Sequence, residues 1–535
     1  MQRLLLTLIL ILTSCAKVVQ KIDANGFNPA ASNQKLHLVF SHNISGETHP
    51  CGCRQFPLGG LSQVAGLFAD LKKDGELLYV DTGDTFFPSS VIPQSMHQSL
   101  TFAANNLAVG LEKLGLKYFI PGDQDFARGM EFLKNLSEVR KFTFLISNLN
   151  DNNQLKNEKI AKIEMQNAKL FFIGLVNPEA INTKEAIFFT DVEKAMPEIM
   201  NQLQAAGYNA SNPFHRLIVL SHAGIDLDEK LAEKYPQIDW IIGAHSQSFL
   251  RFSRDVGNTK MVQVLSKNHY VGEVTIDLLA KKDADTYTLH EIRDELAKKL
   301  EPNPMTNFID EHKAKLSEIQ LKEQAEMSFD YNPKKKANTK VVTKFKTANS
   351  CIACHQAQGE FWQTTPHSLA YLTLINAKEE NNLSCVKCHS LGLNDDRGFK
   401  TAKTIVQFEG KTPAEYLTKL KAIAAPIKSV RQLSSEETKV HAKKWWELDR
   451  EMKVKHNFAN VQCLNCHTKG DEHPYVQEKT DKVTRLAEMK NKCLSCHTRD
   501  QSPEWYEKDQ KGLAKNIDNQ VLDAKIKKMS CPSIQ

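Results

Sequence analysis

The chain has 535 residues, which is too long for one hydrophobic core and predicts two or three domains. Its formal net charge of +6 is modest for this size and its aromatic content is ordinary, so the composition indicates neither nucleic-acid binding nor disorder. Twelve cysteines in a chain of this length also exclude a small disulfide scaffold.

The first fifteen residues, MQRLLLTLILILTSC, predict export. One basic residue precedes an apolar run that is too short to span a bilayer comfortably. LTSC resembles the bacterial lipobox, which implies that Cys15 is lipidated and anchors the protein to a membrane without spanning it. An ordinary signal peptide with an incidental cysteine is the alternative. Ala16 favours the outer membrane by resemblance to sorting signals, with the protein facing the periplasm or cell surface and residues 16–34 as a tether.

Residues 35–280 alternate short apolar runs, such as KLHLVF, ELLYVDTGD, RLIVLSHAG and IDWIIGAHS, with amphipathic stretches. Buried strands separated by helices predict an α/β domain with polar residues at the strand ends. Asp84, His222 and His245 all fall at such ends, where side chains from neighbouring strands converge. The pattern therefore predicts ligands for one metal ion.

The stretches LLYVDTGDTFF and LSHAGIDLDEKLAEKYPQIDWIIGAHSQ resemble the metallophosphoesterase domain of bacterial periplasmic 5′-nucleotidases. The resemblance implies a metallophosphoesterase-like α/β sandwich and, in the family, two metal ions that activate water against a phosphate ester. It places the bridging aspartate on Asp84, an asparagine ligand on Asp123, and two histidine ligands on His222 and His245. Because a carboxylate can replace an amide oxygen, these four imply one complete site for a divalent or soft metal ion.

The same resemblance implies that the second metal site has been lost. Its aspartate and histidine fall on Asn43 and Ser45, its last histidine on Gln247, and the histidine that assists the leaving group on Gln124. The family's C-terminal substrate domain is also absent. We therefore expect no ordinary nucleotidase activity, although a metal-dependent phosphohydrolase with a tethered cytochrome remains the alternative.

Cys51 and Cys53 follow this loop in THPCGCRQFPLGG. Two thiols one glycine apart could bind a soft metal, with His49 as a third ligand, form a strained disulfide with a catalytic redox role, or be structural. PCGC followed by PLGGL resembles a subgroup of nucleotidase-like proteins, some with selenocysteine in this loop, which implies redox use. An inorganic sulfur substrate would fit that use, by analogy of fold alone.

Residues 281–345 are charged and show helical periodicity, which predicts a linker of one or two exposed helices. Residues 346–535 contain the strongest signal in the chain, four C-x-x-C-H motifs. Two thiols at this spacing can form thioethers to the vinyl groups of one haem, and the adjacent histidine can ligate its iron. Zinc sites would not need the histidines. The predicted attachment residues of four haem c groups are Cys351, Cys354, His355, Cys385, Cys388, His389, Cys463, Cys466, His467, Cys493, Cys496 and His497.

Four further histidines permit a second axial ligand on every iron. Residues 345–510 resemble the tetrahaem cytochrome c-554 family, which implies distal roles for His367 and His473. For His441 and His456, a distal role is supported only by the match between four further histidines and four haems and by their nearness to the motifs in the sequence. With two histidines per iron no position is open to substrate, so a mostly α, loop-rich domain packed around porphyrins should transfer electrons to redox partner proteins.

Overall fold

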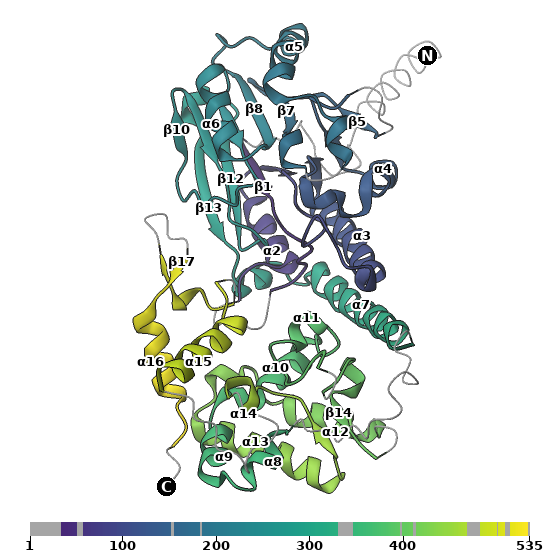
Figure 1. Cartoon of the computed structure of the whole chain (residues 1–535). Helices are drawn as coiled ribbons and strands as arrows, with labels where there is room; N and C mark the ends of the chain where they lie inside the picture. Colours follow the sequence, from purple (N-terminus) through teal and green to yellow (C-terminus); the bar gives the residue numbers. More distant parts are fainter. Residues whose placement is uncertain are drawn as a thin grey trace, which may run out of the picture. The chain divides into compact units, whose positions relative to one another are not determined.

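The computed structural model describes residues 34–50, 57–150, 155–181, 184–329, 346–395, 398–409, 413–467, 482–499, 501–508 and 514–532 (Figure 1). These residues form two compact units. The first contains most of the chain up to Ile309, and the second contains the chain from Asp310 together with Pro93–Ser99. Cys15, Cys51, Cys53 and His473 lie outside the described residues.

Two sheets form the first unit. The seven-stranded sheet has the order β13-β12-β1-β2-β3-β4-β5, and the six-stranded sheet has the order β10-β11-β9-β8-β7-β6. The seven strands are β1 (Lys35–Ser41), β2 (Glu76–Asp81), β3 (Leu116–Phe119), β4 (Thr143–Leu145), β5 (Asn157–Glu158), β12 (Tyr270–Asp277) and β13 (Thr286–Glu291). The six are β6 (Ile160–Met165), β7 (Ala168–Val176), β8 (His215–His222), β9 (Trp240–Ile242), β10 (Arg254–Val256) and β11 (Thr259–Val262). Strands β1 to β5 run parallel, as do β7, β8, β9 and β11.

Successive side chains of β7 point alternately into two apolar cores. Leu170 and Phe172 face the core between the sheets, whereas Phe171 and Ile173 pack with α5 (Val192–Ala205) and α6 (Ile225–Lys234). A Cβ on Gly174 would collide with the carbonyl oxygen of Leu145, so only glycine allows the sheets to approach here. Helices α2 (Leu61–Leu71), α3 (His97–Leu114) and α4 (Gly129–Val139) contribute to the first core. The predicted α/β sandwich is confirmed, because both sheets are covered as parallel sheets require.

The seven-stranded sheet includes residues beyond the predicted domain boundary at residue 280. β13 pairs antiparallel with β12, and α7 (Pro304–Phe329) follows as one long helix, so the stretch predicted as a helical linker also supplies an edge strand. β13 lies at the edge of the sheet and is only partly buried. Charged residues therefore interrupt the alternation of apolar and polar residues that would have predicted a strand.

A buried ionic network joins β1, β12 and β13. Nδ1 of His37 lies 2.6 Å from Oε1 of Glu273, and its Nε2 lies 3.0 Å from Oδ1 of Asp74. Nε2 of His290 lies 2.6 Å from the other Glu273 oxygen. Because ionised carboxylates only accept hydrogen bonds, His37 donates from both nitrogens and is cationic. Burial opposes this charge, but the bonds to Glu273 and Asp74 outweigh it and raise the pKa of His37.

We expect Glu273→Gln to lower the free energy of unfolding by about 2 kcal/mol, the contribution of hydrogen bonds to a buried charge. Burial opposes the charge of Glu273, but the bonds to His290 and His37 hold its pKa well below its usual range. Its contribution is therefore present above its unfolded pKa of 4.5 and fades in acid. The contribution of His37 is present below its unfolded pKa of 6.5 and is lost as the pH rises through the raised folded value.

The loss caused by Glu273→Gln should consequently be largest between pH values of about 4.5 and 6.5. Urea unfolding of the full chain at pH 5.5 and 8.5, followed by tryptophan fluorescence, measures it. The matched control is Glu164→Gln on β6, where a carboxylate with an exposed side chain pairs only with exposed lysines. An equal loss at both pH values would show that the network does not hold the charges assigned to it.

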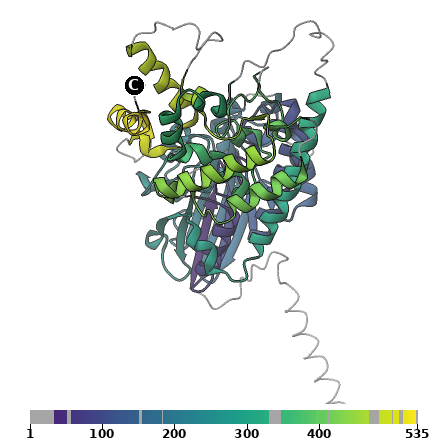
Figure 2. The same ribbon diagram turned by 90° about the horizontal axis from the view of Figure 1, so that it is seen from below.

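The second unit is mainly helical, and its elements are the green and yellow ribbons of Figures 1 and 2. Its helices are α8 (Ala348–Ile352), α9 (Gln356–Gln363), α10 (Ala370–Ala377), α11 (Leu383–Val386), α12 (Ala414–Ala424), α13 (Ser435–Glu451), α14 (Cys463–Cys466), α15 (Lys482–Cys496) and α16 (Asn519–Met529). Two short ribbons pair β14 (Val406–Gln407) with β15 (His456–Asn457), and β16 (Tyr506–Lys508) with β17 (Ala514–Ile517). Leu372, Tyr416 and Trp445 belong to an apolar cluster in this unit, so its side chains form a core of their own.

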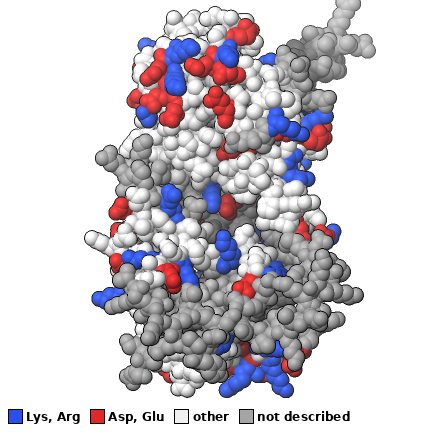
Figure 3. All heavy atoms as spheres, in the orientation of Figure 1, with Lys and Arg blue, Asp and Glu red and all other residues white. Residues whose placement is uncertain are grey.

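None of the helices in the described parts of the chain is both long and apolar enough to cross a membrane. On the face shown in Figure 3, acidic and basic side chains are interspersed over the described atoms, without a continuous field of either sign.

Candidate functional site

The structure brings together all four residues predicted to bind a metal in the first unit. Asp84 follows β2, Asp123 follows β3, His222 ends β8 and His245 follows β9. One ligand atom from each lies within 4.8 Å of the others. The carboxyl ends of parallel strands from both sheets therefore meet at this point.

The geometry of these four side chains fits a cation. Nε2 of His222 is buried without a hydrogen-bond partner and lies 3.4 Å from Asp84 Oδ1 and 3.6 Å from Asp123 Oδ1. Its Nδ1 is bound at 2.6 Å to the Thr82 carbonyl, which fixes the tautomer that presents Nε2 to the site. His245 Nδ1 lies 3.1 Å from Asp123 Oδ1. Two imidazole nitrogens and two carboxylate oxygens are a donor set suited to zinc and similar divalent ions.

Electrostatics at the site also favour a positive charge. Burial opposes a proton on His222, but the carboxylates of Asp84 and Asp123 outweigh it and raise the pKa of the imidazole well above its ordinary value. Burial likewise opposes ionisation of Asp123, yet the neighbouring imidazoles of His222 and His245 hold its pKa below the usual range. A bound cation would take the place of the proton on His222, so affinity should fall in acid.

Backbone strain is concentrated in the same loops. Asn43, Ser45, Asp84, His245 and Gln247 all have left-handed φ angles, between 47° and 65°. Side chains with a Cβ avoid this region, and the strain is retained where a site needs a particular side-chain direction. Asn43, Ser45 and Gln247 share this geometry with two of the four predicted metal ligands, Asp84 and His245.

An asparagine contacts Asp84 on the side where the resemblance to 5′-nucleotidases implies a second metal. The Val264 N–H donates to Nε2 of His42 at 2.9 Å, so the His42 proton resides on Nδ1 and donates to Asn43 Oδ1 at 2.6 Å. Burial lowers the pKa of His42 to about 3, which keeps this ring neutral. The Asn43 amide is thereby turned so that Nδ2 donates to Asp84 Oδ2 at 2.9 Å. One Asp84 oxygen thus receives a hydrogen bond from an amide.

The remaining predicted positions in this region are only partly described. Ser45 Oγ lies 3.5 Å from Gln124 Oε1, so two further residues at lost positions contact each other. Nδ1 of His49 is bound to Thr48 Oγ1 at 3.0 Å. Cys51 and Cys53 lie outside the described residues, and their catalytic role stays a prediction.

The haem motifs of the second unit are arranged in two pairs. The thiols of Cys351 and Cys463 lie close to each other, and so do those of Cys388 and Cys496. All eight motif cysteines are free thiols, as thioether formation requires. The first motif therefore lies against the third, and the second against the fourth.

Hydrogen bonds orient two of the motif histidines. Nδ1 of His389 lies 2.6 Å from the Ala370 carbonyl, and Nδ1 of His497 lies 2.8 Å from Ser502 Oγ. Both rings are held through Nδ1, as secondary hydrogen bonds hold imidazoles that bind a metal through Nε2. The His497 ring also stacks on Trp505 at a centroid distance of 4.0 Å.

His367 lies opposite His497. Their ring centroids are 6.3 Å apart with a 58° angle between the planes. Two imidazoles on one iron should have centroids roughly 6 Å apart, because each nitrogen lies about 2 Å from the metal. Burial lowers the pKa of both rings to about 4, so both are neutral and can ligate iron. These residues therefore fit the two faces of one haem.

The other candidate distal ligands are less determined. His441 on α13 has a buried Nδ1 without a hydrogen-bond partner. His456 on β15 packs against Phe458, with centroids 6.0 Å apart. His473 lies outside the described residues, and all three assignments stay predictions.

Comparisons with known proteins support a 5′-nucleotidase-like first unit and a cytochrome-like second unit. The 5′-nucleotidase of Mus musculus is 22% identical over 241 residues, which covers 42% of this chain and 39% of the mouse protein. Protein 5NUC of Lutzomyia longipalpis is 26% identical over 203 residues, which covers 36% of this chain and 33% of that protein. The first unit is a 5′-nucleotidase-like domain. The chain spans less than half the length of these relatives.

Residues 350–410 of the second unit match the family model described as cytochrome c554 and c-prime. Among solved structures, the 5′-nucleotidase precursor of Thermus thermophilus has a TM-score of 0.44 and 19% identity, covering 53% of this chain and 58% of its own. The sulfate thiohydrolase SoxB of the same organism, solved with glycerol, has a TM-score of 0.43 and 18% identity, covering 53% and 61%.

The sequence did not predict two residues, Asp125 and His42, that position the loops and side chains of the metal site. Asp125 accepts the backbone N–H groups of Asp84, Thr85, Phe86 and Gly122 at 2.8 to 2.9 Å, which ties together the loops that follow β2 and β3. His42 orients Asn43 through the hydrogen bonds described above. Asp125 stands two residues after Asp123 and could have been noticed, but nothing in the sequence indicates its four partners.

Proposed function

We propose that the protein is an electron-transfer cytochrome with four haem c groups, joined to a 5′-nucleotidase-like domain that binds one metal ion and no longer performs two-metal phosphoester hydrolysis. The observation that carries the first part is the pairing of the four haem motifs, together with the spacing of His367 and His497. Haem c supplies reversible one-electron chemistry when bound.

The residues of the second unit have distinct roles in this proposal. The eight motif cysteines hold the porphyrins covalently, and Ser502 and the Ala370 carbonyl orient His497 and His389. His367 and His497 would together hold one haem, and with two histidine ligands that haem would offer no place for a substrate. Contact between motifs one and three, and between two and four, favours electron transfer within each pair.

The contacts of the metal site support the proposal that the first unit no longer performs two-metal phosphoester hydrolysis. A two-metal mechanism needs Asp84 to contact two cations, and the Asn43 amide donates to one of its oxygens instead. The retained cation can still bind and polarise a small substrate on the side of Asp123 and His245, which are both partly exposed. Thiol-based redox chemistry at Cys51 and Cys53 belongs to the same proposal, and phosphohydrolysis is the alternative.

Export with a lipid anchor on Cys15 completes the proposal. It would hold the protein at a membrane surface, the outer membrane being favoured, within reach of periplasmic redox partner proteins.

We expect the full chain, expressed with its leader in a host that matures c-type cytochromes, to carry four haems. Intact mass measures covalent haem, and the pyridine haemochrome spectrum counts it per chain. Cys388→Ala with Cys385→Ala should reduce the number to three. A natural chain with no covalent haem would refute the cytochrome assignment, and turnover of bis-aryl phosphate abolished by Asp84→Ala would refute the loss of hydrolysis.

A further inference from the structure

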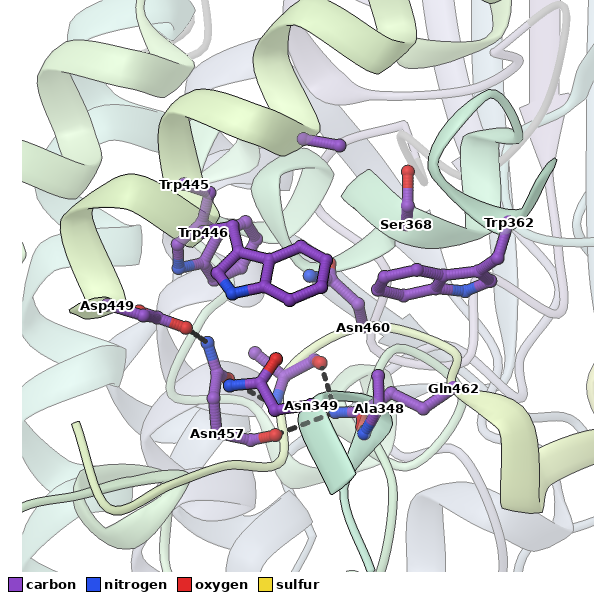
Figure 4. A pocket seen from close by; sticks show the side chains of 12 residues that line it. Ala348, Asn349, Trp362, Ser368, Trp445, Trp446, Asp449, Asn457, Asn460 and Gln462 are labelled. Atoms are coloured by element: carbon purple, nitrogen blue, oxygen red, sulfur yellow. Dashed lines mark hydrogen bonds between the residues drawn. The ribbon is translucent and has the colours of Figure 1, made fainter. Parts of the chain in front are cut away.

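The second unit contains a pocket, lined by both indole rings and polar side chains, that includes none of the haem-attachment residues (Figure 4). Its space measures about 400 Å³, including the part open to solvent. Indole rings of Trp362 and Trp446 stand on two sides of it, and side chains from α8, α13 and residues 457–462 complete the wall. Asn349 at its edge is exposed, so water reaches the pocket.

Asp449 of α13 belongs to this wall and is 6% exposed. Tyr416 of α12 donates to Oδ1 at 2.6 Å, and Asn457 Nδ2 of β15 donates to Oδ2 at 2.7 Å. Trp445 Nε1 donates in turn to the Tyr416 hydroxyl at 2.9 Å. These partners on α12, α13 and β15 are all neutral, and the described residues provide no ion pair for this carboxylate. Burial outweighs the hydrogen bonds and raises the pKa of Asp449 to about 6.

A chain of hydrogen bonds connects this carboxylate with two haem motifs. The Asn457 carbonyl accepts from Gln462 Nε2 at 2.7 Å, and Gln462 Oε1 accepts from the Ala348 N–H at 2.6 Å. Gln462 directly precedes Cys463, and Ala348 begins the helix that contains Cys351. Asp449 is therefore tied to the two segments whose thiols contact each other.

We infer that Asp449 takes up a proton when a haem on the first or third motif is reduced. One electron passes from a redox partner protein to the haem iron and one proton passes from bulk solvent through the pocket to the Asp449 carboxylate, so no net charge is added to this part of the protein. Without a neighbouring cation, the carboxylate responds fully to negative charge arriving nearby. The inference rests on the proposed haem-carrying function.

Potentiometric titration of the haem-loaded full chain between pH 5 and 8 tests this coupling. We expect a haem potential of the natural chain to fall with rising pH around the pKa of Asp449, with a limiting slope of about 59 mV per pH unit for one proton per electron. Asp449→Asn should remove this part of the slope. Tyr416→Phe removes a hydrogen bond that favours the ionised carboxylate, so its inflection should move to higher pH.

Glu436→Gln on α13 is the matched control, because Glu436 is exposed on the same helix, and it should keep the natural slope. An unchanged slope in Asp449→Asn with four haems attached would overturn the inference, since propionates or other groups would then account for it. If Asp449→Asn fails to mature, an unmoved inflection in Tyr416→Phe overturns it equally. A natural chain without haem refutes the proposed function itself, which separates the two failures.

Discussion

A chain carrying Asn43→Asp, Ser45→His and Gln247→His is expected to bind two divalent cations where the natural chain binds one. The first substitution replaces the amide that donates to Asp84 Oδ2 with a carboxylate, so the hydrogen bond becomes a place for a metal. The other two add imidazoles at loop positions that already have the left-handed backbone of the retained ligands. Zinc or manganese per chain, counted separately from haem iron, measures the change.

Single substitutions make the same experiment quantitative. His222→Ala in the natural chain should weaken binding of the one cation by more than about 100-fold, because the loss of a ligand exceeds the loss of a supporting hydrogen bond. Gln263→Asn is a suitable control, since Gln263 is buried near this region but bonds only to Ser246, Ser248 and Ala244. Two cations in the natural chain would contradict the single-site interpretation.

Three of the predicted metal ligands were predictable because each lies at the end of a recognisable apolar strand. Parallel strands bring their carboxyl ends to one edge, so Asp84, His222 and His245 could be assigned before any coordinates, whereas Asp123 was assigned by the resemblance to 5′-nucleotidases. The hydrogen bond from the Asn43 amide to Asp84 was not predictable. It depends on His42 receiving the Val264 N–H from a segment more than 200 residues away, and this contact leaves no periodic signal in the sequence.

In the second unit, the covalent chemistry was predictable from the sequence and the tertiary contacts were not. The four motifs identify the covalent chemistry from local spacing alone, whereas the pairing of Cys351 with Cys463 and of Cys388 with Cys496 depends on tertiary contacts. The apolar cluster around Tyr416 and Trp445 was not expected, because we assigned the interior to porphyrins. Charged residues interrupt the apolar periodicity of α12 and α13, so their buried faces are hard to recognise in sequence.

His367→Ala is expected to convert one of the four haems from low spin to high spin. The His367 ring faces His497 at the separation that two ligands of one iron require, so its removal opens one coordination position. That haem should then bind carbon monoxide, at about one molecule per chain, while the natural chain binds less. Electron paramagnetic resonance and carbon monoxide titration of the reduced protein measure both changes.

His367→Met separates ligation from packing. A thioether in place of imidazole should raise the potential of one haem, because methionine ligation favours the reduced iron. Ser368→Ala is the matched control: the neighbouring hydroxyl is buried and donates only to the carbonyls of Gln363 and Thr365, so its loss should leave spin state and potentials unchanged. Four low-spin haems in His367→Ala would show that another residue, with His441 the first to test, ligates the iron opposite His497.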